Sequence, residues 1–122
     1  MSALYSEAGT GKYRVTARLE RCGGDLSAVV TGGETPHVGA VALAQYEPER
    51  CSATVSVLTA YGHRDDAVAL RFAKALAAAG RCNAAATVGI HVDGADADEI
   101  TVLKENAELC LSAMLAELEE KK

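Results

Sequence analysis

A change in hydrophobic period partway along the chain restricts the fold more than any other feature. Over residues 13–20 apolar and polar side chains alternate, which is typical of a strand with one solvated face. Beyond residue 65 the apolar residues recur at helical spacing, as Val68, Phe72, Leu76 and Ala79 do. The chain therefore contains a strand-rich first half, followed by segments that alternate between helix and strand.

Turn residues separate these segments into seven elements. Strands are predicted at residues 13–20, 26–31, 40–46, 51–58 and 84–91, and helices are expected to begin near residues 65 and 96. We expect the first four strands to form an antiparallel meander, and the first helix to cross over to the fifth strand. The predicted fold is an α+β two-layer sandwich of order ββββαβα, with a five-stranded mixed sheet and two helices on one face.

Capping residues support both helices. Asp65 and Asp66 are expected to cap the first helix, and Gly80 is expected to end it in a left-handed conformation. Asp96 and Glu99 form an acidic version of the capping box at the start of the last helix. The apolar stripe of that helix comprises Ile100, Leu103, Ala107, Leu111, Met114 and Leu118.

A length of 122 residues predicts one domain, with residues 1–11 as a flexible lead-in. Aromatic residues make up only 4%, so the core must be built from aliphatic residues and many alanines. Because small side chains each bury little area, we expect a homo-oligomer.

The net charge of −5 argues against nucleic acid as a partner. We expect no membrane partner and a cytoplasmic protein, because no apolar run approaches the ~20 residues of a membrane span and the N-terminus lacks signal-peptide features. The four cysteines have no CxxC spacing and are interpreted as small core residues.

The predicted strand directions place all three histidines at one end of the sheet. If the five strands run up, down, up, down and down, three connections lie at one end of the sheet: residues 31–39, 61–66 and 89–94. Each of these connections contains one of the three histidines, whereas the opposite end has only tight turns. Loops held by a rigid scaffold are where binding sites usually form, so we expect one ligand site at this end.

The composition of the three loops is typical of a phosphate pocket. Glycines allow backbone amides to form a concave anion site, and an arginine at a helix N-terminus suits a phosphate. Tyr61 and Tyr46 are the aromatic residues expected near these loops. The candidate ligand-binding residues are Thr31, Gly32, Gly33, Thr35, Pro36, His37, Val38, Gly39, Tyr61, His63, Arg64, His91 and Asp93.

Other interpretations stay open. The glycine-rich loop is also consistent with a simple turn, Arg64 with a solvated cap, and His91 with a hydrogen-bonded strand residue. Three imidazoles would suit a zinc or iron site, although no two histidines have the short spacing that usually builds one. The alternatives to a binding protein are therefore a small histidine-dependent enzyme, with or without a metal, that acts on a phosphorylated small molecule, or a structural accessory subunit.

The segments 31–39 and 89–93 resemble those of a known family, the LpdD-type proteins that accompany UbiD-like hydroxyarene decarboxylases. The resemblance covers most of the chain and implies a non-catalytic chaperone. It would bind prenylated FMN, or FMN itself, as its cofactor and serve a UbiD-type decarboxylase as its partner. The residues themselves indicate an anionic ligand and do not indicate a flavin.

Overall fold

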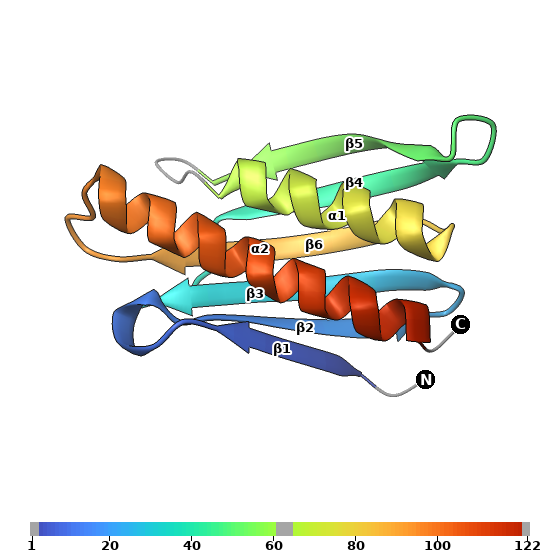
Figure 1. Ribbon diagram of the computed structural model, residues 1–122. Helices are drawn as coiled ribbons and strands as arrows, with labels where there is room; N and C mark the ends of the chain where they lie inside the picture. Colours follow the sequence, from blue (N-terminus) through green and yellow to red (C-terminus); the bar gives the residue numbers. More distant parts are fainter. Residues whose placement is uncertain (1–2, 61–64, 121–122) are drawn as a thin grey trace.

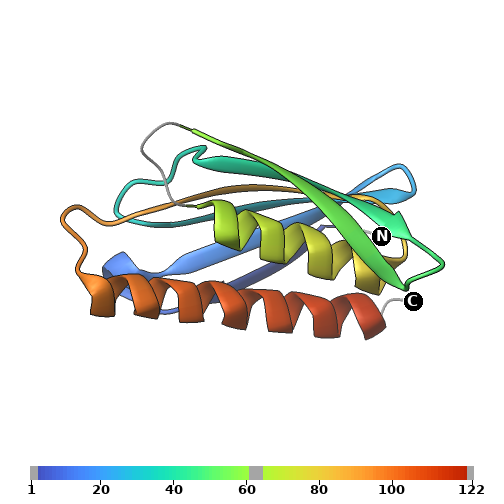
Figure 2. The same ribbon diagram turned by 90° about the horizontal axis from the view of Figure 1, so that it is seen from above.

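The computed structural model describes residues 3–60 and 65–120 and contains one mixed sheet with two helices packed on it (Figure 1). Its elements are β1 (Leu4–Ala8), a short 3-10 helix (Gly11–Tyr13), β2 (Val15–Cys22), β3 (Asp25–Gly33), β4 (Ala40–Glu47), β5 (Ser52–Thr59), α1 (Asp66–Gly80), β6 (Ala84–His91) and α2 (Ala97–Glu120). The strand order is β1-β2-β3-β6-β4-β5, and both helices lie on the same face of the sheet (Figure 2). The predicted α+β two-layer sandwich is thus confirmed.

The predicted number of strands is wrong, because the sheet has six strands and not five. The extra strand is β1, which pairs antiparallel with β2 from Leu4 opposite Leu19 to Ala8 opposite Val15. The expectation of a flexible lead-in therefore fails for Leu4–Ala8. The strand is short and only Leu4 is buried in it, so its hydrophobic pattern is too weak to mark a strand in the sequence.

The predicted antiparallel meander is also wrong. β6 inserts between β3 and β4, parallel to β3 and antiparallel to β4, so β3 and β4 do not pair with each other. All five predicted strand directions nevertheless hold, because β3, β5 and β6 run opposite to β2 and β4. Hydrophobic periodicity identifies the strands and helices, and their order along the chain indicates the direction of each strand. It carries no information on which strands are neighbours in the sheet.

Small side chains fill much of the space between sheet and helices. Alanines of β4 and β6, such as Ala42 and Ala86, are fully buried beneath α1, where Phe72 and Leu76 supply the larger contacts. In α2 the buried residues are Leu103, Ala107, Cys110, Leu111, Met114 and Leu118, which confirms the predicted stripe apart from Ile100. Close approach of small residues lets the helices lie near the sheet, although each alanine buries little area.

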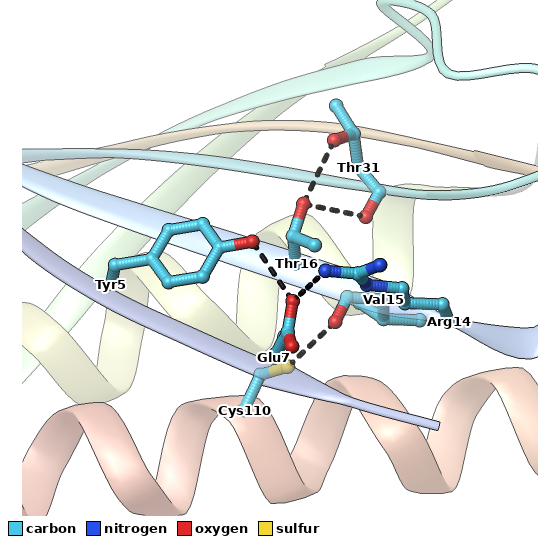
Figure 3. A network of polar contacts seen from close by, with 7 residues as sticks. All are labelled: Tyr5, Glu7, Arg14, Val15, Thr16, Thr31 and Cys110. Atoms are coloured by element: carbon cyan, nitrogen blue, oxygen red, sulfur yellow. Dashed lines mark hydrogen bonds and ion pairs between the residues drawn. The ribbon is translucent and has the colours of Figure 1, made fainter. Parts of the chain in front are cut away.

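Polar contacts attach α2 to the first two strands (Figure 3). The buried thiol of Cys110 donates to the carbonyl oxygen of Val15 at 3.2 Å, and burial raises the pKa of this thiol. Ser6 Oγ donates to the carbonyl oxygen of Cys110 at 2.9 Å. At the surface nearby, Glu7 accepts from Tyr5 and from Arg14. The interpretation of the cysteines as core residues holds for Cys110 but is wrong for Cys22 and Cys51, which are exposed, as Cys82 is in part.

The helix ends agree only in part with the predicted caps. The capping box is confirmed, since Glu99 N donates to Asp96 Oδ1 at 2.8 Å and Asp96 N donates to Glu99 Oε1 at 3.3 Å. In α1 the left-handed residue is Arg81, with φ 53°, and not Gly80. Gly80 is suited to its place for a different reason, because a Cβ there would lie 2.9 Å from Leu26 Cδ1.

Candidate functional site

The histidine-bearing connections meet at one end of the sheet, as the strand directions predicted. Gly33 at the end of β3 is paired with His91 at the end of β6, and Ala40 at the start of β4 is paired with Thr59 at the end of β5. We call this end the loop pole; it is the left end of the sheet in Figure 1, where both helices also begin. Within the described part of the chain, the opposite end carries the short connections and the C-terminal end of α2.

Two of the three histidines are in contact at the loop pole. The ring centroids of His37 and His91 lie 6.1 Å apart, with one ring edge-on to the other. His63, together with Tyr61 and Arg64, lies outside the described residues, so its place in the site stays a prediction from the sequence. The structure thus brings together the β3–β4 connection and the end of β6.

The insertion of β6 explains the length of the β3–β4 connection. Residues 34–39 must pass across the end of β6 to reach β4, which is a longer path than a hairpin turn. The crossing is close, because a Cβ at Gly89 would overlap the backbone carbonyl of His37. Gly33 has a φ of 78°, and a side chain there would overlap the backbone of His91. These glycines are needed for the crossing itself.

Four backbone amides at the β3–β4 connection, from which an anion site was predicted, donate hydrogen bonds within the protein. Gly33 N donates to the carbonyl oxygen of Arg14, and Gly39 N donates to that of Val88. Glu34 N and Thr35 N both donate to the carbonyl oxygen of His91, at 2.8 and 3.3 Å. These four amides are already engaged within the protein and are not available to an anion in this conformation.

A buried carboxylate, Asp65, ties the three connections together. Only 5% of this residue is exposed, and its Oδ1 accepts from the backbone amide of Ile90 at 3.1 Å. Its Oδ2 lies 3.3 Å from His37 Nε2, while His37 Nδ1 lies 2.9 Å from the carbonyl oxygen of Thr35, to which it can only donate. Asp65 occupies the N-cap position of α1, as predicted, but its side chain makes no capping hydrogen bond there, so the predicted side-chain cap is wrong.

The imidazole of His91 is positioned by the β6–α2 connection. Its Nε2 lies 2.9 Å from Asp93 Oδ1, and the amide of Asp93 donates to Glu34 Oε1 at 3.0 Å. The β6–α2 connection is thereby linked to the β3–β4 connection. His91 is half-exposed, so that its ring remains accessible to a ligand.

A pocket of about 420 Å³ opens beside these residues, between the end of β6 and the first turns of α1 and α2. Most of its lining is aliphatic, and its polar side chains are those of Asp65, His91 and Lys104. The lining residues are Asp65, Val68, Ile90, His91, Val92, Gly94, Ala95, Ile100, Leu103 and Lys104. An apolar cavity with a few convergent polar groups is the usual form of a small-molecule site.

Of the predicted site residues that the structure describes, few reach this pocket. His91 lines it directly, and Asp93 and His37 contact lining residues. Thr31 is placed within the sheet, where its Oγ1 lies 3.3 Å from that of Thr16, and Gly32 packs against the backbone of β2. Thr35, Pro36 and Val38 are exposed in the crossing loop. Tyr46 was expected near the site but lies toward the far end of β4, where its amide donates to Asn83 Oδ1.

The prediction missed the contribution of α2 to the pocket. Ile100 and Lys104 are four residues apart on that helix, so they share a face, and both line the pocket. Their spacing is visible in the sequence, but nothing in the sequence distinguishes a pocket wall from an ordinary core stripe.

Within residues 3–60 and 65–120, no group of three or more His, Cys, Asp or Glu side chains is arranged to hold a metal ion. No helix in the same ranges is long and apolar enough to cross a membrane.

The sequence matches a family model described as the prenylated flavin chaperone LpdD-like domain, over residues 9–119. The chain belongs to this family. The LpdD-like domain thus includes the pocket, all of α1, and α2 except for its last residue. No curated protein matches the chain.

A solved structure has a fold similar to that of this chain. It is titled "Crystal Structure of a Novel Chaperone Complex for Yeast 20S Proteasome Assembly" and superposes with a TM-score of 0.60 at 12% sequence identity. The match covers 97% of this chain and 99% of the other. At this identity the likeness concerns the fold alone.

Proposed function

We propose that this protein binds prenylated FMN in the pocket at the loop pole and carries it to a UbiD-type decarboxylase, without catalysing a reaction itself. The observation that supports this best is the pocket's combination of aliphatic walls with the cationic Lys104, in a chain of the LpdD-like family. Prenylated FMN joins a large apolar ring system to a phosphate, so its two parts call for these two kinds of side chain.

The residues present suit such a ligand. A volume of about 420 Å³ lies within the roughly 300–1,000 Å³ usual for small-molecule pockets. Val68, Ile90 and Leu103 offer aliphatic surface to a fused ring, and Lys104 offers a positive charge to a phosphate. The chemistry that prenylated FMN supplies is that of the decarboxylase which receives it.

In this proposal the protein's own residues bind and orient the ligand. His91 contributes a hydrogen-bonding imidazole whose orientation is fixed by Asp93. The crossing loop acts indirectly, by placing His37 against Asp65 and by holding the end of β6 through the carbonyl oxygen of His91. Tyr61, His63 and Arg64 remain candidate ligand contacts on the strength of the sequence.

Filling the pocket tests where the ligand binds. Ile100 and Val102 lie on α2 and are each 37% exposed, but only Ile100 lines the pocket. We expect Ile100→Trp to lower the affinity for prenylated FMN by at least tenfold, because the indole occupies the ligand's space. The matched variant Val102→Trp should bind like the unchanged protein. Anaerobic titration followed by flavin absorbance measures both, and equal affinities would exclude this pocket.

Removing the cation tests the phosphate contact. Lys104→Ala should weaken FMN binding by about 1 kcal/mol, roughly fivefold in Kd, which is the usual contribution of an exposed ion pair. The same change should leave riboflavin binding unaltered, because riboflavin has no phosphate. Lys74→Ala removes an exposed lysine of α1 that does not line the pocket, and it should affect neither ligand. Equal losses for FMN and riboflavin would assign Lys104 another role.

A small histidine-dependent enzyme is the second candidate, and the His91–Asp93 pair favours it. A carboxylate that orients an imidazole is a common arrangement for proton transfer. His91→Gln distinguishes the two functions, because it abolishes acid–base chemistry while keeping a hydrogen-bonding side chain. A binding protein should retain the ligand and deliver it unchanged. Product formation by the unchanged protein that is lost in His91→Gln would favour the enzyme.

A further inference from the structure

The face of the sheet opposite the two helices is not covered by any helix (Figure 2). Alternate residues of the strands point to this face, away from the buried alanines that face the helices. Four of them are large aliphatic residues with exposed side chains: Val29, Val41, Leu43 and Leu58. These four side chains come from β3, β4 and β5 and share one face of the sheet, and contiguous exposed apolar patches often mark protein–protein contacts.

Strand register aligns these side chains in two adjacent rows across β3, β6, β4 and β5. One row comprises Val29, Thr87, Val41 and Leu58, and the other comprises Ser27, Ala85, Leu43 and Ser56. None of the eight residues carries a charge. Two such surfaces can therefore meet without burying a charge and without bringing like charges together.

Charged residues lie at the margin of the patch. Arg18 of β2 is paired with Val29 and Glu20 with Ser27, so they continue the same two rows. Their side chains form an exposed ion pair of 2.8 Å. An apolar centre with a charged rim is the usual organisation of a protein–protein interface.

We propose that this face is the contact between two copies of the chain, packed sheet against sheet about a twofold axis. The four strands that carry the two rows, about 4.8 Å apart and eight or nine residues long at roughly 3.3 Å per residue, present about 500 Å² in projection, and β2 and β1, with Arg18 and Glu20 in the rim, extend the face to about 750 Å². This is close to the roughly 800 Å² per partner that a stable dimer buries. A twofold axis places the uncharged rows of one copy on those of the other, as an isologous interface requires.

The exposed edge of β5 offers another route to self-association, since Ser52–Thr59 contains no charged residue. Pairing at that edge would cover the backbone of β5 but would leave Val29 and Leu43 exposed on inner strands. Only face-to-face packing covers all four aliphatic residues. The inference is independent of flavin binding, because none of the eight residues of the two rows lines the pocket.

Charge substitutions on the two sides of the molecule test the proposal. Leu43 on the sheet face is 57% exposed and Leu109 on α2 is 60% exposed, so lysine should cost each position little as a folded monomer. Light scattering of the chromatographed protein should give twice the 12.6 kDa chain mass for the unchanged protein and for Leu109→Lys. Leu43→Lys should give the mass of one chain.

Circular dichroism establishes that each variant is folded. Leu58→Lys provides a second disruption of the same face, and since 79% of Leu58 is exposed it should fold even if Leu43→Lys does not. A single-chain mass for the unchanged protein would overturn the proposal. So would a dimer that survives Leu58→Lys, which would place the contact at the β5 edge or on the helices, and so would a dimer broken by Leu109→Lys.

Discussion

At the scale of single residues, the carboxylate of Asp65 connects segments that are distant in the sequence. β4 pairs with β6 only as far as Val88, and the next amide of β6 on that side, that of Ile90, donates to Asp65 Oδ1. The other carboxylate oxygen faces His37 in the crossing loop. The sequence marks Asp65 only as a helix-start residue, because an aspartate that caps a helix and one that turns inward have the same local signature.

Asp65→Ala should destabilise the protein by about 1–3 kcal/mol, because it leaves the part-buried amide of Ile90 without its acceptor. The neighbouring Asp66 is exposed, so Asp66→Ala is a matched control that should change stability by less than about 0.5 kcal/mol. Urea unfolding of both variants measures the difference. Equal losses would mean that the buried carboxylate contributes through general charge and not through this contact.

At the scale of elements, the crossing of the β3–β4 connection over β6 accounts for the long glycine-containing loop. The sequence indicates that the loop is too long for a hairpin, and its histidine was correctly placed beside that of β6. It could not reveal the crossing, because the position of β6 between β3 and β4 depends on packing and not on the periodicity of any segment.

Gly89→Ala should impair folding, since its Cβ would overlap the carbonyl of His37 where the loop crosses β6. A loss of about 1–3 kcal/mol or more is usual for overpacking against backbone. Gly24→Ala is the control, because a Cβ at that turn position would meet no atom within 4 Å. Thermal unfolding compares the two, and a harmless Gly89→Ala would mean that the loop does not cross here.

Glu99 at the start of α2 contacts the 3-10 helix, and this contact makes the stability of the protein depend on pH. The ion pair with Lys12 and the hydrogen bond from Tyr13 hold the pKa of Glu99 below its ordinary value of 4.5. The stabilisation is therefore present above the ordinary pKa and is lost as the pH falls through the lowered one. Glu99→Gln should be less stable than the unchanged protein at neutral pH. The urea midpoints of Glu99→Gln and of the unchanged protein should converge in strong acid. A difference between the two midpoints that stays constant with pH would exclude the ion pair as the cause of the lower stability.

At the scale of the whole molecule, the two sides of the sheet differ in what they carry. The helix side contains the core and, at the loop pole, the pocket, while the opposite side presents the uncharged patch. Strand directions allowed the sequence to predict where the loops gather, and it correctly indicated the family. The pocket walls escaped prediction because Ile100, Leu103 and Lys104 acquire their role only when α2 packs beside α1 and the end of β6.

The position of the bound ligand is the most direct test of the central claim. Backbone amide chemical shifts of the protein, recorded with and without saturating FMN and then prenylated FMN, map the contact residue by residue. The largest changes should fall on the end of β6 and the first turns of α2, around Ile90, Val92, Leu103 and Lys104. The turn at Gly23 and Gly24, at the far end of the sheet, should not change. Changes centred on the far end or on the uncovered sheet face, with none around Leu103, would contradict the account.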